Sequence, residues 1–194
     1  RAPRTAAPAA ESAGPVRARI SPALVRLAVA YALFGIGYVV TATFLTSILR
    51  QSETLAPFEA PAWAAVGLAA AGSVWLWGRV SARLGGAWAF SLACLAEAVG
   101  VAASVAFSGL AGMTLAAVLL GGTFMGITSL GLIEGRRLAG GDPRKVMALM
   151  TACFGTGQMI GPTLAGLIAD ATGSFYWPSM AAAALLVLAA LMVG

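Results

Sequence analysis

Six long apolar stretches, separated by short polar turns, constrain this chain more than any other feature of its sequence. They run at about 24–49, 61–78, 87–107, 110–134, 146–169 and 175–193. Each is hydrophobic on all sides and lacks the polar stripe of a surface helix. A membrane core of roughly 30 Å requires about 20 apolar residues per helical crossing. The stretches therefore predict six transmembrane helices, and the short turns predict that consecutive helices lie side by side and antiparallel.

Composition agrees with this prediction. Of the 194 residues, 60% are hydrophobic and 10% are charged, which is less charge than a soluble domain needs to cover its surface. A transmembrane β-barrel would need short segments of alternating hydrophobicity, which the sequence lacks. We therefore expect an all-α integral membrane protein built as a six-helix transmembrane bundle.

The chain contains no histidine and two cysteines. The lack of histidine excludes His-ligated metal, Ser/His dyads and most histidine proton relays. Cys94 and Cys153 both fall inside apolar stretches, where reduced thiols are expected. We predict neither a metal site nor a cofactor.

Basic residues alternate between the two ends of the predicted helices. Eleven of the twelve Lys and Arg residues lie before or at the start of the first stretch, or between the second and third and the fourth and fifth. The other turns hold only Arg50, together with the acidic Glu53, Glu59 and Asp170. Loops rich in Lys and Arg stay on the cytoplasmic side. We therefore expect both termini in the cytoplasm, in a plasma membrane or a bacterial inner membrane.

Residues 1–22 differ from the rest of the chain, being rich in Ala, Pro and Arg. We expect a flexible, basic cytoplasmic linker there, followed by a transmembrane domain over 23–194. The chain begins at Arg1 and not at Met, which fits a fragment of a longer protein. The net charge of +5 comes from residues that set the topology, so no nucleic-acid partner is expected.

Small residues recur in the fifth stretch at Gly157, Gly161 and Gly166, with Pro162 among them. This spacing lets helix backbones approach closely. Proline removes one backbone donor, so Pro162 should kink the helix. Two interpretations stay open for these residues: packing positions, or a hinge that moves.

The segment 78–85 reads Gly-Arg-Val-Ser-Ala-Arg-Leu-Gly and is expected in the loop after the second helix. It is similar to G-x-x-x-D-R-x-G, the cytoplasmic signature of the major facilitator superfamily. Gly78, Arg83 and Gly85 match the signature. Ala82 stands at its acidic position, and Gly86 stands where a basic residue usually follows.

Further segments resemble the same superfamily. Residues 157–166 resemble its Gly/Pro-rich fifth-helix motif, and 31–38 with 170–175 resemble the C-terminal half of the YbfB/YjiJ-type branch. The resemblance covers nearly the whole chain after residue 22. It implies one half of a twelve-helix secondary transporter whose two bundles rock about a central site. The implied partners are membrane lipid, a small-molecule substrate and the N-terminal six-helix half.

Ionisable residues inside a bilayer are costly, and each is a functional candidate. Glu97 lies near the middle of the third stretch. The resemblance places it on the ninth helix of the full transporter, which usually lies at the periphery. Glu97 is either a proton-coupling carboxyl or a neutral carboxyl hydrogen-bonded to a neighbouring helix.

Glu134 lies at the cytoplasmic end of the fourth stretch, beside Arg136 and Arg137. It either pairs with charges at the membrane interface, or it pairs with Arg83 in one conformation and holds the cytoplasmic gate.

The first stretch carries Tyr31, Phe34, Tyr38 and Thr41 on one helical face. The resemblance implies that the first and fourth helices line the substrate cavity. Polar residues that could face the same space are Thr123, Thr128, Ser129 and Gln158. Aromatic rings with hydroxyls and no fixed charge suit a small organic, apolar or weakly polar substrate. The alternative is helix packing, with Thr and Ser bonded to their own helix.

Three classes of function are compatible with a six-helix membrane protein. The first is a secondary transporter that moves a small organic solute by alternating access, coupled to an ion. A membrane-embedded enzyme has no visible residues, because histidine and paired aspartates are lacking. The third class is a half-size protein that dimerises, or a non-transporting scaffold. We predict the transporter and not an enzyme.

Overall fold

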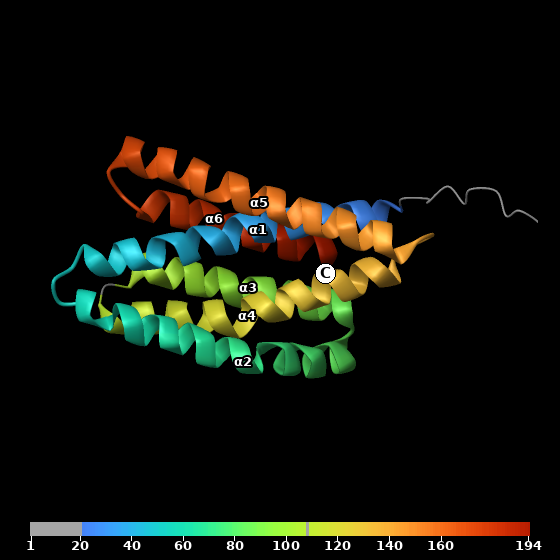
Figure 1. Cartoon of the computed structure of the whole chain (residues 1–194), viewed down its shortest axis with the longest axis horizontal. Coiled ribbons are helices and arrows are strands. Elements are labelled where there is room, and N and C mark those ends of the chain that lie inside the picture. Colours follow the sequence, from blue (N-terminus) through green and yellow to red (C-terminus); the bar gives the residue numbers. More distant parts are fainter. Residues whose placement is uncertain (1–20, 108) are drawn as a thin grey trace, which may run out of the picture.

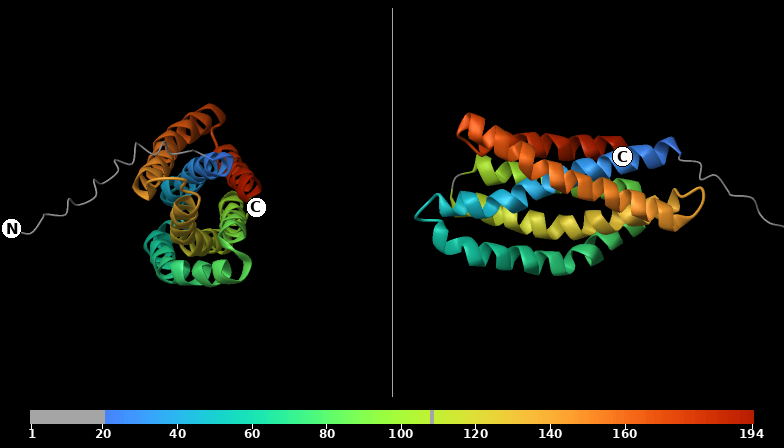
Figure 2. Two further views of the ribbon diagram at one scale, coloured as in Figure 1. Left: turned by 90° about the vertical axis from the view of Figure 1, so that its right-hand side faces the viewer. Right: turned by 45° about the horizontal axis from the view of Figure 1, so that its top comes forward.

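The computed structural model describes residues 21–107 and 109–194, and within them all regular structure is helical. The elements are α1 (Pro22–Arg50), η1 (Ala56–Phe58), α2 (Glu59–Leu84), α3 (Gly86–Ala106), α4 (Leu110–Arg137), α5 (Pro143–Thr172) and α6 (Tyr176–Val193). The helices run along one long axis as a bundle (Figures 1 and 2). The predicted all-α bundle is confirmed. The predicted linker lies outside the described residues, except that Ser21 and Pro22 begin α1.

Helix starts follow local capping chemistry. The Ser21 hydroxyl accepts a hydrogen bond from the Leu24 N–H at 3.2 Å, and Pro22 occupies the first turn of α1. The Asp142 carboxylate likewise caps α5 by accepting a hydrogen bond from the Arg144 N–H, and Pro143 is the first residue of that helix. These caps use backbone groups that a helix terminus leaves unpaired.

Five of the described helical stretches are long and apolar enough to cross a membrane. They are α1, Ala56–Leu84, α3, α4 and α6. The remaining helix, α5, is 30 residues long but less apolar, because glycines, threonines, Gln158 and Pro162 dilute its apolar residues. Helix α5 continues through Pro162.

The second helix is longer than its apolar stretch, and the expectation of a loop at 78–85 is wrong. Helix α2 runs on to Leu84, so Arg79 and Arg83 lie on its last turns. The Arg79 guanidinium packs over the Trp75 ring, 3.9 Å from its centroid. Gly85, with a φ of +89°, separates α2 from α3. Apolarity ends at residue 78, but no residue before Gly85 breaks the helical hydrogen bonds.

Consecutive helices are mostly not the closest neighbours, contrary to the sequence-based expectation. The largest interfaces are α2 with α4, α3 with α4, α1 with α5, and α6 with both α1 and α3. Short turns fix the direction of a helix, whereas small residues select its neighbours. A Cβ on Gly121 would collide with the Val66 backbone, and one on Gly157 would collide with the Ala32 carbonyl.

Side chains of α2 also bind the backbone of α4. The Ser73 hydroxyl and the Trp77 indole both donate to the Gly122 carbonyl, at 2.9 and 2.7 Å. The Gly126 N–H donates to the Ser73 oxygen at 3.0 Å. The turn of α4 from Gly122 to Gly126 is thus hydrogen-bonded to α2.

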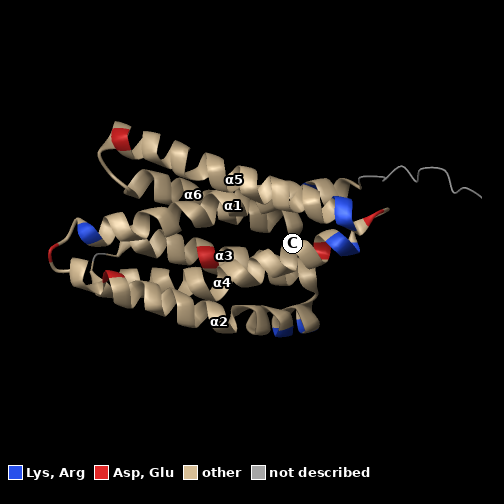
Figure 3. Cartoon of the chain, in the orientation of Figure 1, with Lys and Arg blue, Asp and Glu red and all other residues tan. Residues whose placement is uncertain are grey.

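The two ends of the bundle differ in charge (Figure 3). We call the "basic end" the one that holds Arg79, Arg83 and the α4–α5 connection, and the "far end" the one that holds the α1–α2 connection. At the far end Arg50 and Glu59 form a two-pronged ion pair with distances of 2.7 and 2.9 Å. This pair ties the end of α1 to the start of α2.

Candidate functional site

Five rings from three helices stack inside the bundle, and we call them the aromatic cluster. They are Tyr31, Phe34 and Tyr38 of α1, Phe124 of α4 and Phe154 of α5. The Tyr38 ring is nearly parallel to those of Phe124 and Phe154, with interplanar angles of 6° and 8° and centroids 5.7 Å away in each case. Helical spacing on α1 supplies three of the rings, and helix packing supplies the other two.

Tyr38 and Gln158 meet at the half-buried edge of this cluster. The Gln158 amide nitrogen donates a hydrogen bond to the Tyr38 hydroxyl. Pro162 has no N–H, so the Gln158 carbonyl lacks its usual donor four residues ahead. A phenol, an amide and a carbonyl therefore gather beside flat apolar rings.

Tyr31 and Phe34 lie deeper and are almost fully buried. The Tyr31 hydroxyl donates to the Thr128 carbonyl at 3.0 Å, which satisfies it inside the core. A Cβ on Gly131 would meet the Tyr31 ring, so α4 is close at this point. The face predicted on α1 thus divides into a packed inner part and a half-buried edge at Tyr38.

The hydroxyl candidates differ from one another. Thr123 and Thr128 each donate to the carbonyl four residues earlier on α4, at 2.6 and 2.7 Å. Ser129 is half-buried. Thr41 is buried, and its hydroxyl has no hydrogen-bond partner among the described residues. Back-bonding to the helix thus occupies two of the four hydroxyls.

Glu97 is fully buried on α3, the helix that packs against both α4 and α6. Thr123 is its neighbour on α4, because Gly100 packs against Leu119 one turn away along each helix. The Thr123 hydroxyl donates its hydrogen bond to the Leu119 carbonyl. Neither carboxyl oxygen of Glu97 has a hydrogen-bond partner within the described residues. No buried Lys or Arg is present in that part of the chain to pair with it. A carboxyl so placed is costly to ionise.

Fifth-helix small residues mostly serve packing. A Cβ on Gly157 would collide with the Ala32 carbonyl, and one on Gly161 would lie 2.8 Å from Val39 and 3.0 Å from the Ile36 carbonyl oxygen. Gly166, in contrast, has no atom within 4 Å of its Cβ position. The hinge interpretation of these residues and of Pro162 stays a prediction.

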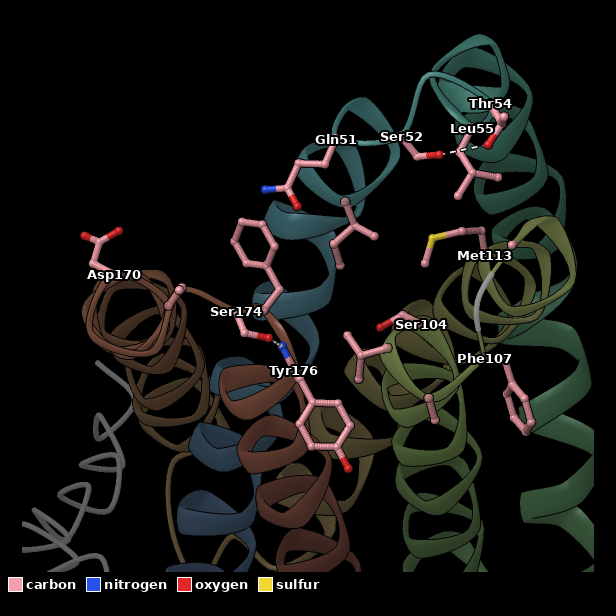
Figure 4. A pocket seen from close by; sticks show the side chains of 17 residues that line it. Gln51, Ser52, Thr54, Leu55, Ser104, Phe107, Met113, Asp170, Ser174 and Tyr176 are labelled. Carbon is pink, nitrogen blue, oxygen red and sulfur yellow. Dashed lines mark hydrogen bonds between the residues drawn. The ribbon is translucent and has the colours of Figure 1, made fainter.

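Sequence reasoning missed a hollow of about 870 Å³ at the far end, which we call the far-end hollow. The connections α1–α2, α3–α4 and α5–α6 surround it, with Ser104 on its floor and Asp170 at its rim (Figure 4). None of the predicted cavity residues lines it. No local pattern signals such a space, because its walls come from three separate connections. In the described residues no cluster of His, Cys, Asp or Glu suits a metal ion.

The whole chain, residues 1–194, matches the family described as "Uncharacterised MFS-type transporter YbfB". The chain belongs to this family. No match was found among curated proteins. The predicted major facilitator resemblance is thereby confirmed, and the chain is a multi-pass membrane protein of a transporter family.

The MFS-type signature at 78–85 gains a physical explanation where this chain departs from it. Gly86 begins α3, and a Cβ there would overlap the Glu134 carboxyl. Glu134 is 7% exposed and thus fills the place of the side chain that Gly86 lacks. A negative charge near a helix N-terminus is stabilising. Glu134 provides a carboxylate at the start of α3, whereas Ala82, at the acidic position of the signature, provides none.

Glu134 has Arg137 as its ion-pair partner, at 3.6 Å. Arg83 is exposed, and the described residues give it no ion pair. A small cavity of about 230 Å³ lies beside Glu134, with Arg26 and Arg137 in its wall. The pair of Glu134 with Arg83 stays a prediction for another conformation.

Proposed function

We propose that this chain is the C-terminal half of a secondary active transporter of the MFS type. It moves a small organic solute by alternating access, coupled to protons, together with an N-terminal six-helix half. The basic end faces the cytoplasm in a plasma membrane or a bacterial inner membrane. Family membership supports transport, and the lack of histidine and of paired aspartates argues against an enzyme.

The observation that carries this proposal is the half-buried edge of the aromatic cluster. Tyr38, Phe124 and Phe154 offer flat apolar faces, and Gln158 adds an amide and a carbonyl. This edge carries no fixed charge. It suits an uncharged solute that has an apolar ring or chain and one or two hydrogen-bonding groups.

Exposed apolar residues support the partner half. Helix α2 is the least buried of the apolar helices, with Leu68 at 79% exposure. On α5, which is less apolar, Met159 is 78% exposed. Large exposed apolar side chains grouped on a helix face mark contacts with lipid or with another protein. Because α5 is too polar to face lipid on all sides, we assign one face of it to the N-terminal half.

The test uses the full-length transporter, purified and reconstituted in proteoliposomes, with a panel of uncharged aromatic and aliphatic solutes. Tyr38→Ala and Gln158→Ala should each raise the KM for the transported solute by about tenfold, since each removes roughly 1.4 kcal/mol of binding. Trp88→Ala is the control, because it also removes an aromatic ring, and Trp88 is exposed near the start of α3, outside the aromatic cluster and the far-end hollow.

An unchanged KM in both variants would remove the aromatic cluster from the substrate path. Failure of the wild-type protein to move any solute of the panel, with or without a pH gradient, would favour the scaffold or the half-size dimer instead.

A further inference from the structure

Three buried hydroxyls lie between the far-end hollow and Glu97, and we call them the hydroxyl ring. They are Thr41 of α1, Ser104 of α3 and Ser179 of α6, each no more than 3% exposed. Ser104 donates to the Val101 carbonyl at 2.6 Å. Thr41 and Ser179 have no hydrogen-bond partner in the described part of the chain. Buried hydroxyls without partners are uncommon and call for an explanation.

Helix register brings these hydroxyls to one level. Gly37 of α1 packs against Ala182 and Leu186 of α6, so in this antiparallel pair the next turn of α1 places Thr41 opposite Ser179. The Ser91 hydroxyl of α3 donates to the Ala190 carbonyl of α6 at 2.7 Å. Because α3 and α6 are antiparallel, moving along α3 from Ser91 to Ser104 corresponds to moving back along α6 from Ala190 to the turn that holds Ser179. Ser104 and Ser179 therefore lie at the same height in the bundle.

This level is the floor of the far-end hollow. Ser104 lines the hollow directly, and the α6 residue Tyr176 lies one turn above Ser179 in its wall (Figure 4). The ring therefore separates a space of about 870 Å³ from the interior of the bundle.

Glu97 lies directly below the ring. On α3 it precedes Ser104 by two turns, which is about 10 Å along the helix. Its register on α4 agrees, because Gly100 packs against Leu119, and Thr123 lies against the Glu97 carboxyl. An unpaired carboxyl thus lies beneath two unpaired hydroxyls, on a line from the hollow.

We propose that the hydroxyl ring is the access route by which protons from the far-end solution reach Glu97. This inference rests on the proposed function, in which transport is coupled to protons, and it assigns the coupling proton to Glu97. A proton is passed through water and the ring hydroxyls to a carboxylate oxygen of Glu97, where an O–H bond forms as one in the donor breaks. The proton later leaves Glu97 past Tyr38, at the half-buried edge of the aromatic cluster.

The surroundings of Glu97 suit this role. The groups around it are Tyr38 of α1, Thr123 beside it on α4, and Cys94 one turn away on α3. Helix α6 contributes apolar residues such as Ala183 to this core. No charged side chain of the described residues is buried beside Glu97, so proton uptake there meets no competing ion pair.

The test measures how fast the carboxyl proton of Glu97 exchanges with deuterium, by infrared spectroscopy of the full-length transporter in lipid. The probe is heavy water alone, and no substrate is needed. Glu97→Gln should remove the carboxyl band and so assign it. Thr41→Val and Ser179→Ala should each slow its exchange by about tenfold, the effect of losing one hydrogen-bonded relay step.

Two controls separate a route from a general disturbance. Thr41→Ser keeps the hydroxyl and should keep the wild-type rate. Ser91→Ala removes a buried hydroxyl nearer the basic end of α3 and should leave the exchange unchanged. Exchange that ignores Thr41→Val and Ser179→Ala, or that Ser91→Ala slows equally, would overturn the route.

The same variants distinguish this inference from the proposed function. Solute uptake that responds to a pH gradient, with exchange that does not depend on the ring, overturns the route alone. Ring-dependent exchange in a protein that moves no solute overturns the transport proposal and leaves the route standing.

Discussion

Two adjacent glycines of α4 differ in what a side chain would meet at each. At Gly121 a Cβ would collide with the Val66 backbone of α2, whereas at Gly122 no atom lies within 4 Å. Gly121→Ala should therefore destabilise the protein by about 1–3 kcal/mol, because the α2 backbone must move away. Gly122→Ala should be neutral or stabilising by up to about 1 kcal/mol, since alanine favours the helix.

Thermal unfolding of the two variants in detergent checks this pair directly. Since both substitutions add one methyl group to the same helix, their difference isolates the α2–α4 contact. Equal melting temperatures would contradict the close approach at Gly121.

At the scale of single residues, sequence spacing found part of the candidate site. It predicted that Tyr38 and Gln158 share a space, and the two are hydrogen-bonded. It missed Phe154, although Phe154 precedes Gln158 by one helical turn and so shares its face. It also assigned Glu97 to a peripheral helix. Within this bundle α3 is the most buried of the apolar helices, and Glu97 is fully buried on it, which the helix number alone does not reveal.

At the scale of the element, α2 offers a test of helix against loop at 78–84. Ala82→Pro should destabilise the protein by about 1–3 kcal/mol, because proline removes a donor and clashes with the preceding turn of α2. Ala87→Pro is the matched control, since it lies in the first turn of α3, where proline is tolerated. Melting temperatures in detergent provide the measurement, and equal stability of the two variants would favour a loop.

Element lengths and partners were predictable to different degrees. Apolar runs located all six helices, but they ended α2 too early, because a helix can leave the apolar layer and keep its hydrogen bonds. They gave no information on neighbours. The contacts of Gly121 with Val66 and of Gly157 with Ala32 join residues far apart in sequence, so only packing in three dimensions reveals them.

At the scale of the whole molecule, orientation in the membrane is open to direct measurement. We start from a variant that lacks Cys94 and Cys153, the two free cysteines. Glu53→Cys at the far end should react with a membrane-impermeant maleimide in intact cells. Gly140→Cys at the basic end should react only after the membrane is permeabilised, because basic loops stay in the cytoplasm. The reverse labelling pattern would invert the topology, and with it the direction of the proposed proton route.

The hydrogen bonds from Ser73 and Trp77 to α4 have a mechanical consequence. They fasten α2 to α4 through backbone groups, and glycine contacts fasten α1 to α5. Helices α1 and α4 meet through the ring faces of Tyr38 and Phe124, through one hydrogen bond from Tyr31, and through a buried apolar cluster that includes Leu45 and Leu120. Stacked rings tolerate lateral offset, whereas a hydrogen-bonded rung does not. We therefore expect the rings of Tyr38 and Phe124 to permit more sliding between α1 and α4 than the hydrogen bonds from Ser73 and Trp77 permit between α2 and α4.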